Sequence, residues 1–468
     1  LVLPGPGDGG RRGGVLVVAP RDTPEGVRAG ASATGVMLVL ADLVARTNNR
    51  RPFLFVSTDG STVGNAGIRW FLSRFEGFDI EAAVVLDDPG AAVGDVVEIW
   101  SLGTDGRAAF DMARLAAANA EPGARADPTP SLGRQLIDGA VPQTFGDQGP
   151  IVAQGIPAVT LSARRDSPLR RGPDPTERRL DQVGNAAFRL LGALDEDTSV
   201  PGPTHAVTVG EQTLRPGIAR IALILLALPV LVAAADLFSR LRRARIPFLP
   251  GALALTVRAA PALTVVIVGY FMVLAGLIPG LSAGGLPQPQ DVPLDATAGL
   301  GLAVAALAGV GSYLLARQLT RRVGASPASE ASAALLLLAA LLVLTWLVRP
   351  YTLILALPVA HAALLATAAT RRAAVAALVA AAAVPLLLLI ATVAAGLDRN
   401  PLYAAWYTYA TSVAGVRGAV GYTLAAALAA CLWALAALVA FRARKGLVVD
   451  AHDRRSRRRP RPVAEGRS

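Results

Sequence analysis

Hydrophobic and polar positions divide the chain into two parts with different patterns. Up to about residue 200, short apolar runs alternate with longer stretches whose apolar residues recur at helical spacing. The short runs predict strands at 14–19, 52–57, 82–86, 95–102 and 158–161. The longer stretches predict helices at 33–46, 63–75, 107–119 and 180–194. Such alternation is typical of an α/β domain with a mostly parallel sheet and flanking helices.

Beyond residue 216 the apolar runs are long enough to cross a bilayer, which takes about 20 residues. They predict seven spanning helices, at 217–238, 260–281, 297–316, 332–348, 351–370, 373–397 and 418–441. Between the last two lie Tyr403, Trp406, Tyr407 and Tyr409. Because Tyr and Trp favour the membrane interface, we expect a loop on the bilayer surface there. The predicted fold is an α/β domain followed by an all-α polytopic membrane domain.

Domain boundaries follow from these patterns. We expect a linker or leader remnant at 1–13, the α/β domain at 14–200, a linker at 201–216, the membrane bundle at 217–441 and a basic tail at 442–468. The chain starts with Leu1, and its first residues resemble the outer end of a removed segment. We therefore expect a signal peptide or an anchor helix upstream, and an uncleaved anchor would make eight spans.

Composition and charge place the two parts relative to the membrane. Hydrophobic residues are 53% and charged residues 17% of the chain, against about 25% charged in ordinary globular domains. Arginine clusters follow the first, third, fifth and seventh predicted spans, whereas the alternate loops hold few bases. Since cytoplasmic loops concentrate Lys and Arg, residues 1–214 should be extracytoplasmic and the tail cytoplasmic. Lys445 is the only lysine, which suggests a GC-rich bacterial genome and hence a bacterial plasma membrane.

Two classes of partner or site are disfavoured by composition. The basic tail has no aromatic residues among 454–461 to stack on bases, so we expect it to face anionic lipid and not nucleic acid. Cys431 is the single cysteine, which excludes an internal disulfide and a cysteine zinc site. The three histidines are His205, His361 and His452, and none lies in residues 1–200.

Short polar motifs follow the predicted strands, in loops that should share one rim of the sheet, at 20–32, 58–62, 87–90 and 146–150. They read Ala19-Pro20-Arg21-Asp22, Ala31-Ser32-Ala33-Thr34-Gly35, Thr58-Asp59-Gly60-Ser61-Thr62-Val63-Gly64, Leu86-Asp87-Asp88-Pro89-Gly90 and Gly146-Asp147-Gln148-Gly149-Pro150, followed by Gly155-Ile156-Pro157. In order and spacing, residues 14–196 resemble the zinc aminopeptidase family that includes leucyl aminopeptidases and aminopeptidase Y.

The resemblance implies a fold in which two zinc ions are held by His, a bridging Asp, Glu, Asp and a second His, beside a glutamate base. The matching ligand positions here are Pro20, Ala31, Thr62, Asp87 and Gln148, with Asp22 as a supporting residue. Ser61 stands at the position of the base. Zinc needs three or four nitrogen, sulfur or carboxylate donors. We therefore expect no zinc, no cofactor and no catalytic residue in this chain.

Other chemistries for the rim are open. Ser61 could be a nucleophile, but no histidine or suitably placed lysine would activate it. Asp22, Asp59, Asp87 and Asp147 could bind Ca²⁺ or Mg²⁺ through oxygen atoms alone. We favour the simpler reading that these aspartates cap loops. Desolvated carboxylates are costly unless they are paired, so Asp22 and Asp87 should be held by backbone N–H groups or by an arginine, with Arg21 and Arg28 as candidates.

His361 lies in the middle of the fifth predicted span and is a possible intramembrane polar site. A hydrogen bond to a Ser, Thr or Tyr of a neighbouring helix is the favoured interpretation. Asp236, at the inner end of the first span, is the only acid that the predicted spans contain. Charged pairs deep inside the bundle would instead favour transport.

Three functions fit the sequence. The favoured one is a membrane-anchored, catalytically inactive relative of zinc peptidases that serves as a binding or scaffolding component of a membrane complex. Its architecture resembles the attachment subunit of the GPI transamidase, and its partners would be the bilayer, a membrane protein, or a peptide or lipid-linked ligand. The alternatives are an active membrane-bound metallopeptidase, and a transporter or lipid-handling protein with an accessory outer domain.

The arginine distribution gives a first testable prediction. A cysteine placed at Ser199 should react with a membrane-impermeant thiol reagent in intact cells, because residues 1–214 are expected outside. A cysteine at Ser456 in the basic tail is the control and should react only after lysis. Labelling of the Ser199→Cys variant only after lysis would contradict this topology.

Overall fold

The computed structural model describes residues 1–5, 13–22, 29–75, 78–91, 96–120, 131–168, 174–196, 199–209, 212–278, 286–368 and 372–414. These residues form two compact units. The first comprises Leu1–Ile221, Tyr270–Gly301 and the described residues from 388 to 414, and the second comprises Ala222–Gly269 and Leu302–Leu387.

A six-stranded mixed sheet forms the centre of the first unit. Its strands are β1 (Val2–Leu3), β2 (Gly14–Pro20), β3 (Phe53–Thr58), β4 (Ile80–Asp87), β5 (Glu98–Trp100) and β6 (Ala158–Ser162), in the order β1-β3-β2-β4-β6-β5. The four inner strands are parallel neighbours, as predicted, whereas the edge strands β1 and β5 run antiparallel. All of β2 is buried, which is typical of a parallel strand covered on both faces.

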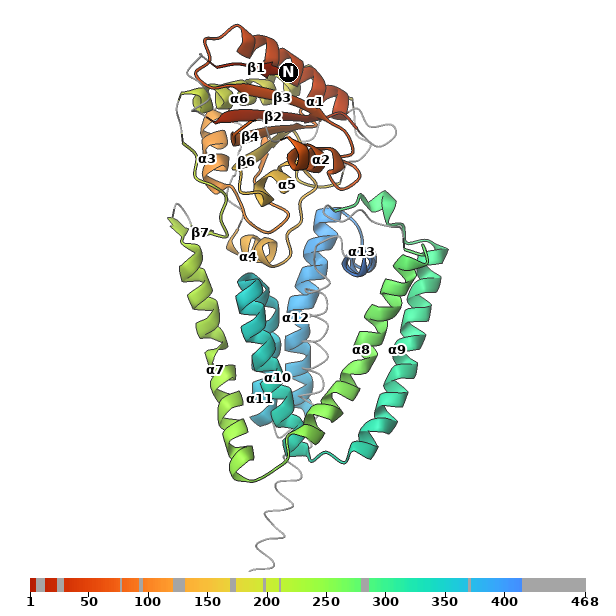
Figure 1. Ribbon diagram of the computed structural model, residues 1–468. Helices are drawn as coiled ribbons and strands as arrows, with labels where there is room; N and C mark the ends of the chain where they lie inside the picture. Colours follow the sequence, from red (N-terminus) through yellow and green to blue (C-terminus); the bar gives the residue numbers. More distant parts are fainter. Residues whose placement is uncertain are drawn as a thin grey trace, which may run out of the picture. The chain divides into compact units, whose positions relative to one another are not determined.

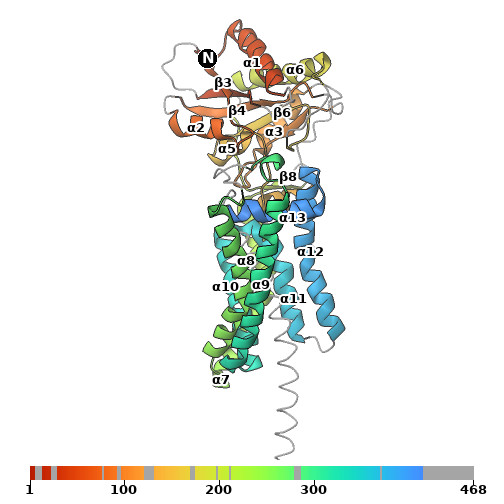
Figure 2. The same cartoon turned by 90° about the vertical axis from the view of Figure 1, so that its right-hand side faces the viewer.

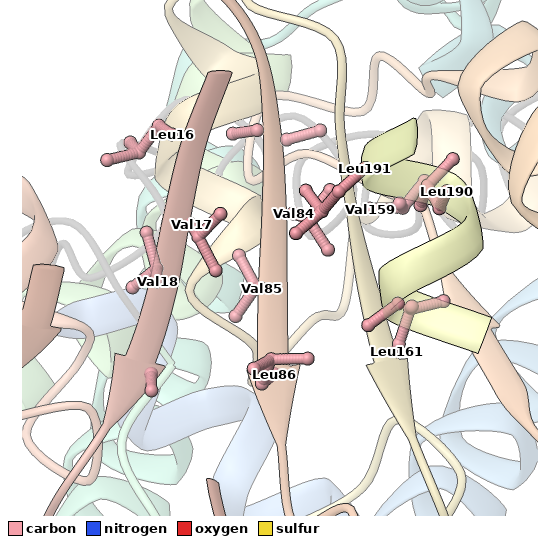
Figure 3. Packing of buried hydrophobic residues seen from close by; sticks show 14 of the residues in the cluster. Leu16, Val17, Val18, Val84, Val85, Leu86, Val159, Leu161, Leu190 and Leu191 are labelled. Carbon is pink, nitrogen blue, oxygen red and sulfur yellow. The ribbon is translucent and has the colours of Figure 1, made fainter. Parts of the chain in front are cut away.

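Helices cover both faces of this sheet (Figure 1). On one face lie α1 (Ala29–Ala45), α3 (Phe110–Asn119) and α6 (Glu177–Asp195); on the other lies α5 (Gln148–Ala153), with α2 (Ala66–Arg74) beside it. The crossovers that contain α1 and α2 move in opposite directions along the sheet, so their helices lie on opposite faces. Figure 3 shows the resulting core, in which valines and leucines of the inner strands pack against Leu190 and Leu191 of α6.

Several short elements were not predicted. Val2–Leu3, expected in a linker, pair with β3, and the expected linker after residue 200 contains a hairpin of β7 (Val207–Val209) and β8 (Gln212–Leu214). Helix α4 (Leu132–Ala140) begins after Ser131, whose side chain accepts a hydrogen bond from the Arg134 amide. Elements of two to nine residues span too few periods for the apolar pattern to reveal them.

The second half of the chain is helical, with α7 (Pro216–Arg243), α8 (Leu249–Leu274), α9 (Ala296–Val323), α10 (Pro327–Val348), α11 (Leu353–Ala368), α12 (Arg372–Leu397) and α13 (Pro401–Val413). Among the described residues, five helices are long and apolar enough to cross a membrane: α7, α8, α9, α10 and α12. Helix α11 is shorter, and both the seventh predicted span and the basic tail lie outside the described residues. The count of seven spans is thus not confirmed.

Helices α8 and α9 lie side by side in both views (Figures 1 and 2), and two glycines of α9 explain how closely they approach. A side chain at Gly301 would overlap the Met272 side chain. A side chain at Gly309 would begin 2.9 Å from a methyl carbon of Val265. Small residues allow such close helix packing in membranes.

The aromatic stretch near residue 405 is a helix, not the loop that we expected. Asn400 caps α13 by accepting a hydrogen bond from the Tyr403 amide at 2.8 Å, and Pro401 occupies the first turn. Trp406 and Tyr407 are buried in the first unit. The aromatic residues therefore pack within the protein, a role that their preference for membrane interfaces does not reveal.

The core makes a second prediction. Leu190 is fully buried between α6 and the sheet, so Leu190→Ala should lower the free energy of unfolding of this unit by about 2–5 kcal/mol. Hydrogen exchange of the β4 and β6 amides in the full chain would measure the loss. Leu132, which is 47% exposed, is the control, and Leu132→Ala should cost less than about 0.5 kcal/mol. Equal protection in the two variants would contradict the described packing.

Candidate functional site

The loops that carry the motifs meet at one rim of the sheet. β2, β3 and β4 are parallel neighbours, so their carboxyl ends lie at the same edge. Thr58, at the end of β3, donates a hydrogen bond to Asp147 at 2.8 Å. The loop that follows it binds Asp22, which comes just after β2. The predicted shared rim is therefore confirmed for the described parts of these loops.

The carboxylate of Asp22 is hydrogen-bonded to the loop that contains Ser61 and Thr62. One carboxylate oxygen accepts from the amide and hydroxyl of Ser61 at 2.9 and 2.8 Å. The other oxygen accepts from the amide and hydroxyl of Thr62 at 2.8 and 2.7 Å. Burial alone would raise the pKa of Asp22, but these hydrogen bonds outweigh it and hold the pKa below its usual value. The carboxylate therefore acts as the brace of this loop.

Asp87, the ligand position that keeps its carboxylate, is paired with an arginine. The guanidinium of Arg164 donates to Asp87 at 2.5 Å, and both side chains are about nine-tenths buried. Burial raises the pKa of Asp87, and the charge of Arg164 offsets part of that effect. The expectation that an arginine holds Asp87 is confirmed, although the arginine is Arg164. Arg21 instead lies 3.5 Å from the exposed Asp59, and Arg28 is outside the described residues.

Several neighbours fix Arg164 in place. Its guanidinium carbon lies 5.0 Å from the centre of the Trp100 ring, within cation–π range. Trp100 donates its indole N–H to the Arg164 carbonyl at 3.2 Å, and the guanidinium also donates to the Ser167 carbonyl. A carboxylate oxygen of Asp88 lies 3.7 Å from the guanidinium Nε of Arg164. Burial, and to a lesser extent the charge of Asp87, raises the pKa of Asp88 to about 6.

Two further carboxyls are buried beside this pair. Asp147 accepts from the Asn65 amide group and the Thr58 hydroxyl, both at 2.8 Å, yet burial raises its pKa to about 6. Asp166 accepts from the Phe145 amide at 2.9 Å, and burial raises its pKa to about 6 as well. The rim is thus a cluster of acidic groups with Arg164 as a buried cation among them.

The other ligand positions supply few donors for zinc. Pro20 is buried at the end of β2, and Ala31 lies at the start of α1. Gln148 is fully buried, where it donates to Thr144 at 2.7 Å and accepts from Thr160 at 2.6 Å. Its amide is therefore used inside the protein. The residues at these positions do not fit a zinc site, which needs three or four convergent donors.

The open alternatives gain no support from the described residues. Within them, no group of three or more His, Cys, Asp or Glu side chains is placed to hold a metal ion, so the oxygen-only Ca²⁺ or Mg²⁺ cluster is not formed there. The Ser61 hydroxyl donates to Asp22, a carboxylate that already accepts three other hydrogen bonds. Asp22 and Asp59 accept hydrogen bonds from loop amides, as the capping interpretation expects. Asp147 accepts from the side chains of Thr58 and Asn65, and Asp87 is paired with Arg164.

Arg164, Asp88 and Asp166 were missed from the sequence. Arg164 and Asp166 come directly after β6, which is parallel to β4, so their loop begins at the same rim. The carboxyl end of that last strand was the signal that could have identified them.

The helical part holds a charged pair that the sequence reading also missed. Arg258 of α8 lies 2.9 Å from Glu330 of α10, and both side chains are largely buried. The statement that Asp236 is the only acid of the spans is therefore wrong, because α10 begins at Pro327 and α8 at Leu249. Glu330 lies in the first turn of α10, where an acidic residue also stabilises the helix N-terminus. His361 bonds to the Leu357 carbonyl of its own helix at 2.8 Å, not to a neighbouring helix.

Comparison with protein-family models and with curated proteins gives no match. Among solved structures, BSAP, a zinc aminopeptidase from Bacillus subtilis, is similar at 16% identity and a TM-score of 0.32, covering 44% of this chain and 52% of its own. LapA of Legionella pneumoppila is similar at 16% identity and a TM-score of 0.30, and the match covers 41% of this chain and 55% of LapA. An aminopeptidase from Aneurinibacillus sp. strain AM-1 is similar at 15% identity and a TM-score of 0.32, and the match covers 46% of this chain and 50% of that protein. The chain thus spans about half the length of these proteins.

Burial of Asp147 predicts a pH dependence. Its pKa is raised from 3.8 to about 6, so folding favours the protonated form. The free energy of unfolding should therefore fall as pH rises from about 4 to about 6, by roughly 3 kcal/mol at most. The Asp147→Asn side chain can still form hydrogen bonds with Thr58 and Asn65 but does not titrate. This variant should therefore lose the part of the pH dependence of unfolding free energy that Asp147 contributes. Hydrogen exchange of the full chain at both ends of this range measures it, with exposed Asp59→Asn as control; an unchanged slope in Asp147→Asn would refute the assignment.

Proposed function

We propose that this chain is a membrane-anchored, peptidase-like protein whose sheet domain no longer catalyses hydrolysis and serves instead to bind or position a partner. The observation that carries the proposal is the ion pair between Arg164 and Asp87. In this pair the buried positive charge of Arg164 lies against Asp87. Asp87 is the one carboxylate among the five positions that correspond to zinc ligands in the family.

Electrostatics disfavour a metal ion at that carboxylate. A divalent cation bound to Asp87 would face the guanidinium of Arg164 at close range, where two like charges repel strongly in a poorly solvated site. Moving Arg164 away would break its contacts with Trp100 and Ser167. Arg164 thus neutralises Asp87 in the way that a metal ion would in an active relative.

The hydrolytic machinery is also incomplete. A glutamate base would accept a proton from the attacking water, whereas a serine hydroxyl has no suitable pKa for that task. Ser61 stands at this position and its hydroxyl donates to Asp22. These features disfavour the alternative of an active membrane-bound metallopeptidase.

The membrane part supports a role at a membrane surface. Among the described residues, five helices are long and apolar enough to span a bilayer, which supports an integral membrane protein. The arginine pattern supports an extracytoplasmic sheet domain, and the near absence of lysine supports a bacterial plasma membrane. A peptide or a lipid-linked substrate of a membrane complex is the class of ligand that we infer. The pair of Arg258 and Glu330 lies too close to a helix end to favour transport by itself.

Metal content tests the proposal. The purified full chain should hold well below one zinc ion per molecule by elemental analysis and should release no amino acid from peptide substrates, because Pro20, Ala31, Thr62 and Gln148 replace donors. A variant with Pro20→His, Ala31→Asp, Ser61→Glu, Thr62→Glu and Gln148→His should bind zinc more tightly when Arg164→Met is added than without it.

The matched control adds Arg165→Met, which removes the neighbouring exposed arginine. Stoichiometric zinc in the unmodified chain that is lost on Asp87→Asn would overturn the proposal. Equal zinc binding with and without Arg164→Met would show that this arginine does not stand against the metal.

A further inference from the structure

A proline-rich segment at 286–293, with the sequence Leu-Pro-Gln-Pro-Gln-Asp-Val-Pro, is held by aromatic side chains of α13 in the first unit. We call these residues the strap. Tyr407 donates its hydroxyl to the Pro287 carbonyl at 2.7 Å. Tyr403 donates to the carbonyls of Pro289 and Val292 at 2.7 and 3.0 Å. The Trp406 indole donates to the Pro293 carbonyl at 3.2 Å.

This pattern matches the chemistry of proline-rich peptides. Proline has a carbonyl acceptor and no N–H donor, so a proline-rich backbone offers mainly acceptors. The three aromatic side chains donate hydrogen bonds to its carbonyls, and three of the four carbonyls bound belong to prolines. Gln288, with φ −67° and ψ 150°, has the polyproline II conformation, and Pro289–Asp291 then form a single 3₁₀ turn. Recognition domains also use aromatic-lined surfaces to bind proline-rich peptides, although those peptides are extended.

The strap also contacts the rim of the sheet. An isolated antiparallel β-bridge joins Pro287 to Val63. Val63 follows Thr62, whose amide and hydroxyl bind Asp22. A peptide that replaced the strap would therefore lie against the rim loop that the family resemblance assigns to the zinc site.

We propose that Tyr403, Trp406 and Tyr407 of α13 form a binding site for a proline-containing peptide, and that the strap is its resident ligand within the chain. The proposal deepens the proposed function, on which it rests, by naming the peptide class. A peptide that competes with the strap would gain access to the edge formed by Val63. The zinc measurement and the peptide measurement can fail independently.

The test uses the full chain with residues 286–293 replaced by a Gly-Ser linker of equal length. Fluorescence anisotropy of a labelled peptide Leu-Pro-Gln-Pro-Gln-Asp-Val-Pro should show binding at least tenfold tighter to this variant than to the unmodified chain, whose strap fills the site. Adding Tyr407→Phe should weaken binding about tenfold, since one buried hydrogen bond is lost. Tyr313→Phe is the matched control, because Tyr313 is 58% exposed on α9.

A folded linker variant that does not bind the peptide overturns the proposal. So does equal binding of the peptide Leu-Ala-Gln-Ala-Gln-Asp-Val-Ala. If the linker variant does not fold, Tyr407→Phe in the otherwise unmodified chain replaces it. Amides of Gln288, Asp291 and Val292 should then exchange several-fold faster than in Tyr313→Phe, and equal exchange rates would reject the site.

Discussion

The ion pair between Arg164 and Asp87 is the interaction on which the rim of the sheet domain depends. Asp22, Asp88, Asp147 and Asp166 are gathered around Asp87, and burial raises the pKa values of most of this group. A lone buried charge is costly, and removing one partner of a buried pair typically costs about 3–5 kcal/mol. Arg164 makes it possible for parallel strands to bring several carboxyls to one edge.

The two halves of this cluster are stabilised in different ways. Asp22 accepts four hydrogen bonds and stays readily ionised, which orders the loop of Ser61 and Thr62. Asp147 and Asp166 are more desolvated, so their charged forms are less stable near neutral pH. In each case the polar atoms are bonded to the protein. A rim whose carboxylates are hydrogen-bonded or paired within the protein is suited to holding its shape and poorly suited to binding a metal ion or activating water.

Sequence patterns predicted the inner strands well, because β2, β3, β4 and β6 are buried apolar runs between turns. They missed the short edge strand β1 and the nine-residue α4, which contain too few periods to stand out. The partner of Asp87 could be foreseen only as a class of residue. Arg164 and Arg165 look alike in the sequence, and only the fold turns the first toward Asp87 and leaves the second exposed.

The contacts of the aromatic residues of α13 could not be predicted from the sequence either. Tyr and Trp are amphipathic, so their polar ends need hydrogen bonds and their rings need burial, and a bilayer interface provides both. The strap provides both as well, because its carbonyls accept hydrogen bonds from all three side chains and Trp406 and Tyr407 are buried. Composition cannot distinguish these two environments, whereas the pairing of Tyr403, Trp406 and Tyr407 with one proline-rich segment can. That pairing and the bridge between Pro287 and Val63 connect α13 to the rim loop through one short segment. Displacement of the strap would therefore remove a contact of the rim without any change in the sheet itself.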